Sequence, residues 1–154
     1  RARDAIAVLD TSGEPLAVGC RARPNWAKPN AVEAKELVDT ALDTDKEIRR
    51  TLSEIRSMGP ELVLMSLDSR AAAIITKQGT WFGHAPHIQE VSAVGAGDCL
   101  LTGAFCSWLR GEPAKEILRW GVASGTAAAL GAGSAMPTRT AVEAVINLVV
   151  VTPL

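Results

Sequence analysis

VSAVGAGDC, residues 91–99, is the most informative segment of this 154-residue chain. Gly95 and Gly97 free successive backbone N–H groups to point into one concavity where a helix begins, which makes an anion-binding turn. Asp98 follows directly, and a carboxylate there would repel a bound phosphate but suits a base that removes a proton from an attacking hydroxyl. Taken alone, the segment fits equally well a loop whose aspartate caps the helix. With support from other residues, it predicts phosphoryl transfer to an alcohol.

A second polar segment, KPNAVE at residues 28–33, follows a short extended stretch. Pro29 biases Lys28 away from helix, so a helix can start after Asn30 as its N-cap. Asn30 and Glu33 lie three residues apart across this helix start, where their oxygens could hold a hydrated Mg²⁺. The alternative is that Asn30 caps the helix and Glu33 completes a capping box, which is the simpler interpretation of the segment by itself.

The remaining segments predict strands and helices in a mixed order. Apolar runs at residues 5–10 and 62–67 are typical of strands buried on both faces. Residues 72–76 and 80–82 predict a hairpin that turns at Gln78-Gly79 and forms an antiparallel edge. We expect helices over residues 16–20, from residue 31 onward, and over residues 43–58, 98–109, 113–130 and 140–148, with capping boxes at Thr11-x-x-Glu14 and Thr140-x-x-Glu143. This order predicts one domain over residues 1–154, a three-layer α/β/α architecture with a mostly parallel sheet.

Composition narrows the function classes. The 16 Lys and Arg residues nearly balance the 17 Asp and Glu residues, so no global field favours nucleic acid or an anionic membrane. No apolar run approaches the roughly 18 residues of a membrane span. The three cysteines lack CxxC spacing and even pairing, which favours a reducing cytoplasm. We therefore expect a cytoplasmic protein with no nucleic-acid or membrane partner.

Both polar segments resemble signatures of the ribokinase, or PfkB, carbohydrate kinases. VGAGD at residues 94–98 resembles the second family signature, and KPNAVE resembles the KPNxxE element. DTSGE at residues 10–14 is similar to the branch that holds 1-phosphofructokinase, tagatose-6-phosphate kinase and the minor 6-phosphofructokinase. GVASGTAAA at residues 121–129 resembles the small-residue helix that the family packs beside the adenine.

The resemblance implies a ribokinase-like fold of which this chain is the C-terminal, nucleotide-binding part, without the N-terminal half, the sugar-binding residues and the β-lid. It implies ATP and Mg²⁺ as cofactors, with K⁺ as a further candidate. The acceptor would be a ketohexose phosphate such as fructose-1-phosphate, fructose-6-phosphate or tagatose-6-phosphate, and the full-length protein would form a homodimer.

The resemblance also implies roles for individual residues. Asp98 would be the catalytic base beside an anion hole, and Asn30 and Glu33 would form the magnesium and phosphate element. Lys28 would contact the nucleotide phosphates. Other nucleotide contacts would come from Ser66, Asp68, Ala71 and Gly125, the anion hole from Gly95, Ala96 and Gly97, and a monovalent-cation loop from Ser92, Val94, Ala128 and Gly133.

One segment departs from the family pattern. SLDSRA at residues 66–71 stands where the family usually has Ser-Leu-Gly-x-x-Gly, so Asp68 and Ala71 replace both glycines. A carboxylate beside the triphosphate and a side chain where glycine allows close approach should weaken ATP binding, with Arg70 as a partial compensation. The alternative function is therefore a truncated or degenerate kinase that keeps the fold without catalysis.

Overall fold

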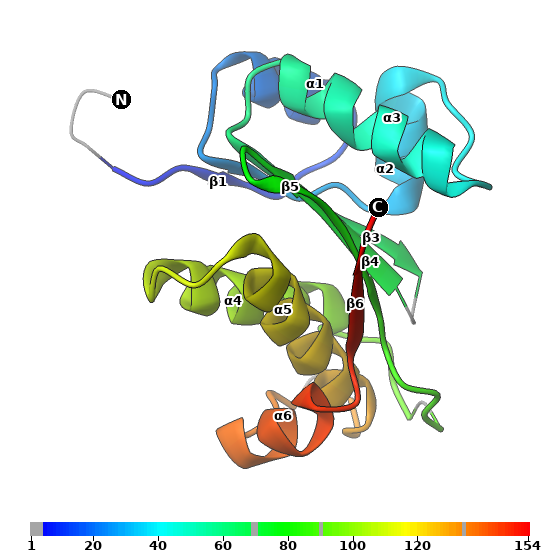
Figure 1. The fold of residues 1–154 in the computed structure, drawn as a ribbon, viewed down its shortest axis with the longest axis vertical. Coiled ribbons are helices and arrows are strands. Elements are labelled where there is room, and N and C mark those ends of the chain that lie inside the picture. The colour runs from blue at the N-terminus through cyan, green and yellow to red at the C-terminus, as the bar shows by residue number, and fades with distance from the viewer. Residues whose placement is uncertain (1–4, 69–70, 90, 134) are drawn as a thin grey trace.

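The computed structural model describes the chain except for residues 1–4, 69–70, 90 and 134. Two helical layers enclose one sheet, with α1 to α3 on one face and α4 to α6 on the other (Figure 1). This arrangement confirms the three-layer α/β/α prediction. The helices are α1 Gly13–Arg21, α2 Ala31–Val38, α3 Asp45–Ser57, α4 Ala96–Leu109, α5 Ala114–Ala129 and α6 Arg139–Ile146. The strands are β1 Val8–Leu9, β2 Trp26–Ala27, β3 Leu62–Asp68, β4 Ala71–Thr76, β5 Gly79–His84 and β6 Val150–Pro153.

The six strands follow one another across the sheet in chain order. β1, β2 and β3 pair in parallel, and from β3 to β6 every neighbouring pair is antiparallel. The parallel half is the one that carries crossover helices, whereas β4 and β5 are joined by a short turn, which can connect only antiparallel strands. The sheet is thus mixed, and its antiparallel part extends beyond the expected hairpin. That hairpin is confirmed, with its turn at Lys77 and Gln78, one residue earlier than predicted.

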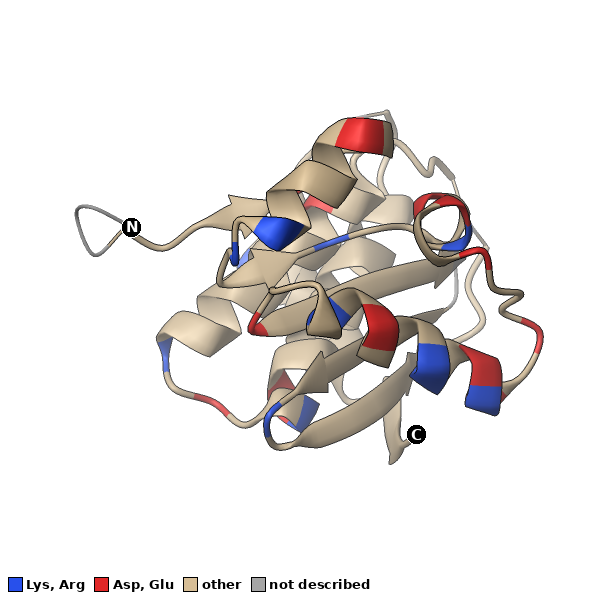
Figure 2. Ribbon diagram, turned by 90° about the horizontal axis from the view of Figure 1, so that it is seen from above, with Lys and Arg blue, Asp and Glu red and all other residues tan. Residues whose placement is uncertain are grey.

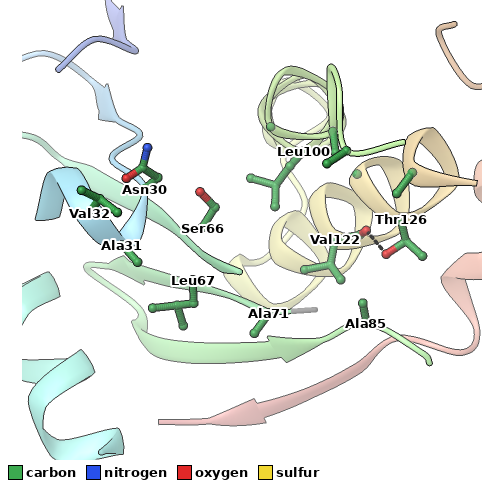
Figure 3. Close-up of a pocket in the computed structure, with 15 residues that line it drawn as sticks. Asn30, Ala31, Val32, Ser66, Leu67, Ala71, Ala85, Leu100, Val122 and Thr126 are labelled. Carbon is green, nitrogen blue, oxygen red and sulfur yellow. Dashed lines mark hydrogen bonds between the residues drawn. The ribbon is translucent and has the colours of Figure 1, made fainter. Parts of the chain in front are cut away.

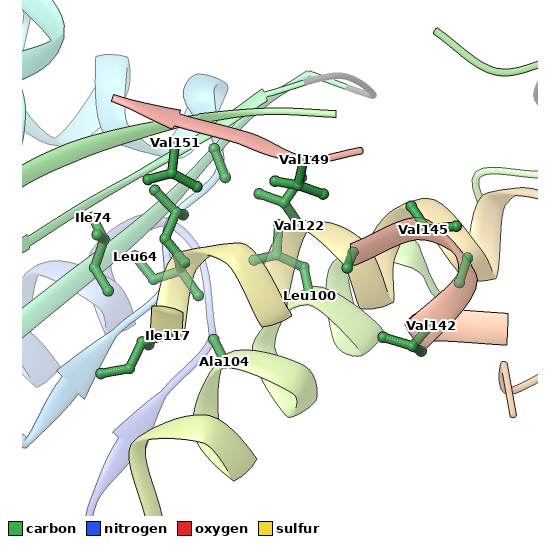
Figure 4. Packing of buried hydrophobic residues seen from close by; sticks show 14 of the residues in the cluster. Leu64, Ile74, Leu100, Ala104, Ile117, Val122, Val142, Val145, Val149 and Val151 are labelled. Carbon is green, nitrogen blue, oxygen red and sulfur yellow. The ribbon is translucent and has the colours of Figure 1, made fainter. Parts of the chain in front are cut away.

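The central strands are buried on both faces, as their unbroken apolar runs predict. In β3, Leu62 and Leu64 face the core under α4 to α6, and Val63 and Met65 face the core under α1 to α3. Figure 4 shows the first of these cores, where Leu64 and Ile74 of the sheet pack towards the helices. Fully burying one such side chain contributes about 1.5–3 kcal/mol, so the two cores fix the sheet between its layers.

Both ends of the sheet differ from the prediction. The strand expected at residues 5–10 is reduced to β1, and Ile6 and Val8 are 46% and 36% exposed rather than buried. β1 pairs with β2 on one side and is the edge of the described sheet, so no neighbour covers it. At the other edge, the chain was expected to close with three helices, but strand β6 follows them and pairs with β5. Its four residues are too few for a clear periodicity.

Two helix starts also differ. Ser12 is the N-cap of α1 and makes no side-chain capping hydrogen bond, so the expected capping box at Thr11 is wrong. α6 starts earlier than predicted because Thr138 caps it, with its Oγ1 accepting from the Ala141 N–H at 3.2 Å. Glu143 instead accepts from Arg139 Nε at 2.7 Å, one turn away on the same exposed helix face.

Acidic and basic residues are interspersed along the helices in the view of Figure 2. α3 is the clearest case, because its sequence DKEIRRTLSEIRS alternates both signs around a buried stripe of Ile48, Leu52 and Ile55. None of the helices in the described part of the chain is long and apolar enough to cross a membrane.

Candidate active site

A pocket of about 310 Å³ opens between the carboxyl end of β3 and helices α2, α4 and α5. Figure 3 shows Asn30 and Ser66 on one side of it and Leu100, Val122 and Thr126 on the other. Its lining is mostly aliphatic, which suits the flat face of a heterocyclic base. The lining residues are Asn30, Ala31, Val32, Ser66, Leu67, Ala71, Ala85, Ala93, Ala96, Gly97, Leu100, Val122, Gly125, Thr126 and Ala129.

The predicted anion-binding turn lies at the edge of this pocket. Gly95 is the N-cap of α4 and has φ = 80°, a left-handed conformation that favours glycine. Gly95 has no side chain to cap the helix, and the Ala96 N–H donates to the Ala93 carbonyl at 3.2 Å. The N–H groups of Gly97 and Asp98 have no partner among the described residues and could donate to an anion. Ala96 and Gly97 both line the pocket. The anion-hole role of Gly95, Ala96 and Gly97 stays a prediction.

Asp98 is in the first turn of α4 and is exposed. Within the described residues, its carboxylate has no hydrogen-bond partner, so the alternative in which Asp98 serves as a helix cap finds no support. The role of Asp98 as a base stays a prediction. Asp98 does not line the pocket itself but follows directly on Gly97, which does.

Lys28 belongs to the KPNAVE segment, and its side chain lies close to the VGAGD segment at the start of α4. Its side chain is only 8% exposed, and its Nζ donates to Asp10 Oδ1 at 3.0 Å. The same Nζ lies 4.0 Å from the position that a Cβ on Gly97 would occupy. A cation is thus held beside the amino end of α4, where the phosphates of a nucleotide would meet both the ammonium and the helix dipole.

Asn30 and Glu33 form the capping box that was the simpler interpretation of their spacing. Asn30 Oδ1 accepts from the Glu33 N–H at 2.9 Å, and Glu33 Oε2 accepts from the Asn30 N–H at 2.8 Å. Asn30 lines the pocket, whereas Glu33 lines a separate hollow together with Glu14 and Glu36. Each of these side-chain oxygens has lone pairs beyond those used in the capping box, so the two residues could still bind Mg²⁺. The Mg²⁺ role therefore stays a prediction.

The other predicted nucleotide contacts divide into two groups. Ser66, Ala71 and Gly125 line the pocket. The backbone of Asp68 pairs with Ala71 across an irregularity in the β3–β4 ladder, but its side chain lies outside the described residues, as does Arg70. The expected weakening by Asp68 and Ala71 stays a prediction.

The monovalent-cation loop stays a prediction, and the structure shows how part of this segment is held. The N–H groups of Val91 and Ser92 donate to the Ala129 carbonyl at 2.9 and 3.2 Å, which ties this loop to the carboxyl end of α5. Ala128 is buried there, whereas Val94 is 62% exposed. Gly133 has φ = 64° in the following loop and does not line the pocket.

Sequence reasoning assigned no individual role to several residues of the site, and it placed Val122 and Thr126 only within the small-residue segment 121–129. Leu100, Val122 and Thr126 line the pocket from α4 and α5, and the Thr126 hydroxyl donates to the Val122 carbonyl at 2.8 Å, so it presents its methyl side as an apolar group. Asp10 was recognised in the sequence only as part of the DTSGE segment. Asp10 is the first charged residue after a strand of the parallel half. Such residues lie together at one edge of the sheet, so this position could have identified Asp10 as a site residue.

The cysteine beside Asp98 is expected to be unreactive. Burial, and secondarily the Asp98 carboxylate, raise the pKa of the Cys99 thiol, and burial raises the pKa of Cys20. Cys106 is exposed. At pH 7.5, iodoacetamide followed by mass spectrometry should therefore label Cys106 at least tenfold faster than Cys99 or Cys20. Comparable rates for Cys99 and Cys106 would contradict the described packing of α4.

The sequence of the chain matches the model of the pfkB family carbohydrate kinases over residues 3–141. The chain belongs to this family. It is 32% identical over 128 residues to the 1-phosphofructokinase of Borreliella burgdorferi and 32% identical over 127 residues to that of Bacillus subtilis. Both alignments cover 82% of this chain and 42% of the relative.

The fold is also similar to that of a solved enzyme. The structure of phosphofructokinase-2 from Escherichia coli in complex with potassium matches with a TM-score of 0.85 and 26% identity, over 92% of this chain and 46% of that one. This similarity confirms the ribokinase-like fold class. The chain spans less than half the length of the relatives that it matches.

Proposed function

We propose that the protein to which this chain belongs transfers the γ-phosphoryl group of ATP to a hydroxyl of a ketohexose phosphate. The observation that carries this proposal is the glycine-capped amino end of α4, where the N–H groups of Gly97 and Asp98 and the carboxylate of Asp98 have no partner among the described residues, with an aliphatic pocket beside it. An anion site next to a free base serves phosphoryl transfer to an alcohol. The names of the relatives support a phosphorylated sugar as the acceptor.

The nucleotide would lie with its base in the aliphatic pocket and its phosphates at the amino end of α4. There the ammonium of Lys28 and the N–H groups of the first helical turn attract negative charge. Asp98 would accept the proton of the attacking hydroxyl as that oxygen bonds to the γ-phosphorus and the bond to the β-phosphate oxygen breaks. The proton ends on the carboxylate, and ADP leaves with the electron pair.

Mg²⁺ and K⁺ are proposed as cofactors on the chemistry of the donors present. Asn30 and Glu33 offer the hard oxygens that Mg²⁺ prefers, although no group of three or more metal-ligating side chains occurs in the part of the chain that the structure describes. Water and the nucleotide would therefore complete the coordination, and the ion would neutralise phosphate charge when bound. K⁺ would be held near Ser92 and Gly133.

The second candidate function is a kinase fragment that keeps the fold without catalysis. The replacement of two family glycines by Asp68 and Ala71 favours it. We place the protein in the cytoplasm, because Cys20, Cys99 and Cys106 are all free thiols. A homodimer remains the proposed assembly of the complete protein.

Calorimetric titration of the chain with Mg-ATP, beside a kinase assay, separates the two candidates. The acceptors are fructose-1-phosphate, fructose-6-phosphate and tagatose-6-phosphate. Binding with turnover of one acceptor would support a sugar-phosphate kinase. Binding alone would indicate a nucleotide site that needs further chain to hold the sugar. Absence of both would favour the inactive fragment.

A further inference from the structure

The ion pair between Asp10 and Lys28 follows from the register of the parallel strands. Val8 pairs with Trp26 and Leu9 with Ala27, so the next step sets Asp10 opposite Lys28 just beyond the strand ends. The Lys28 N–H donates to the Leu9 carbonyl at 2.9 Å, which continues the ladder to this position. Side chains alternate along a strand, so Lys28 lies on the same face as Trp26, which packs under α4.

The placement of the ammonium depends on this pair. Lysine has a flexible four-carbon stem, and an ammonium taken out of water needs a partner to stay charged. The Lys28 side chain is 8% exposed and the Asp10 side chain 33%, so the pair is anchored on its lysine side and open to solvent on its aspartate side. The Asp10 carboxylate at 3.0 Å directs the Nζ group to its position near Gly97.

We infer that Asp10 is a positioning residue, which holds the Lys28 ammonium beside the amino end of α4 and so makes it available to the phosphates of a bound nucleotide. This inference rests on the proposed function. Asp10 acts through Lys28 rather than by touching the nucleotide. Its own charge repels a polyanion, so simple electrostatics predicts the opposite effect for its removal. Loss of the positioning would weaken Mg-ATP binding, whereas loss of the repulsion would strengthen it, so a measured Kd distinguishes the two effects.

Three variants of the chain test the inference by calorimetric titration with Mg-ATP and with adenosine. Asp10→Ala removes the partner of Lys28 and should raise the Kd for Mg-ATP about tenfold while leaving adenosine binding unchanged, because only the phosphate contact is lost. Asp10→Asn keeps a side-chain oxygen that accepts from the ammonium, so its Kd should rise less than about threefold. Asp45→Asn removes one charge from the exposed start of α3 and is the matched control.

A double-mutant cycle links the effect to Lys28. In a Lys28→Met background, Asp10→Ala should change the Kd for Mg-ATP less than about twofold, because the residue that it positions is already gone. Tighter Mg-ATP binding by Asp10→Ala, or an equal loss in both backgrounds, would overturn the positioning role. A defect that disappears at high Mg²⁺ would overturn it too, since Asp10 would then act on the metal.

Lysine acetylation by acetic anhydride, read by mass spectrometry, tests the placement without any nucleotide. Lys28 should react at least about fivefold faster in Asp10→Ala than in the unsubstituted chain, because a released ammonium becomes accessible. Unchanged reactivity would overturn the inference. If the unsubstituted chain binds no Mg-ATP, the proposed function of this chain fails, and the acetylation result alone decides whether Asp10 holds Lys28.

Discussion

Asp98→Asn should lower the rate of phosphoryl transfer by about 10³-fold or more while leaving the Kd for Mg-ATP within about threefold of its original value. The carboxylate is exposed and has no hydrogen-bond partner in the described part of the chain, so its replacement by the isosteric amide leaves no buried group unsatisfied. The backbone N–H groups at the amino end of α4 are unchanged by this substitution. Only the proton acceptor is lost, and single-turnover kinetics beside calorimetry would separate the two quantities.

The control for this experiment is Asp45→Asn, which removes the same charge from the first turn of another helix. It should leave both turnover and nucleotide affinity unchanged. Both variants should be made and assayed in a form of the protein that phosphorylates a sugar phosphate, either this chain or a longer one. Turnover by Asp98→Asn within tenfold of the unsubstituted protein would remove Asp98 from the role of base.

The parts of the site that the sequence could predict are those that local geometry determines. The glycines at 95 and 97 predicted a helix start, and the spacing of Asn30 and Glu33 allowed a capping box; both the helix start and the capping box are present. These features depend on residues within one turn of each other. The pairing of Lys28 with Asp10 depends instead on the register of two strands 18 residues apart, which no local pattern specifies.

The errors at the sheet edges have a similar origin. Apolar residues 5–8 fit a central strand, but burial is decided by whether another strand lies alongside, and β1 is the edge of the described sheet. β6 was missed because the pairing that defines it comes from β5, about 70 residues earlier in the chain. Hydrophobic periodicity predicts whether a segment forms a helix or a strand, but it does not determine which strands lie beside it.

The contact between α4 and α5 could likewise not be predicted from the glycines alone. A Cβ on Gly121 would meet the Leu100 carbonyl at 3.0 Å, and one on Gly125 would meet the Ala96 carbonyl at 3.0 Å. Backbone therefore touches backbone along this interface, and Gly125 contacts the first turn of α4. The small-residue character of α5 serves close helix packing and thereby fixes the position of the anion-binding turn.

Gly103→Ala should destabilise the fold by about 3 kcal/mol or more. A Cβ at this position would lie 2.1 Å from Ser124 Oγ, 2.6 Å from Ser124 Cβ and 2.7 Å from the Trp120 carbonyl oxygen. Two of these atoms cannot move without α5, so the helices must separate. Chemical denaturation followed by circular dichroism would measure the loss in the free energy of unfolding.

Gly97→Ala is the matched control, because it adds the same methyl group to the same helix where the nearest atom is Lys28 Nζ at 4.0 Å. Alanine favours helix over glycine by up to about 1 kcal/mol, so this variant should be neutral or slightly more stable. Adding Ser124→Ala to Gly103→Ala should recover only a small part of the loss, because the Trp120 carbonyl stays in place. Full recovery in the double variant, or equal stabilities for the two single variants, would mean that α4 and α5 do not meet through their backbones, and the amino end of α4 would then lack the support that positions Asp98.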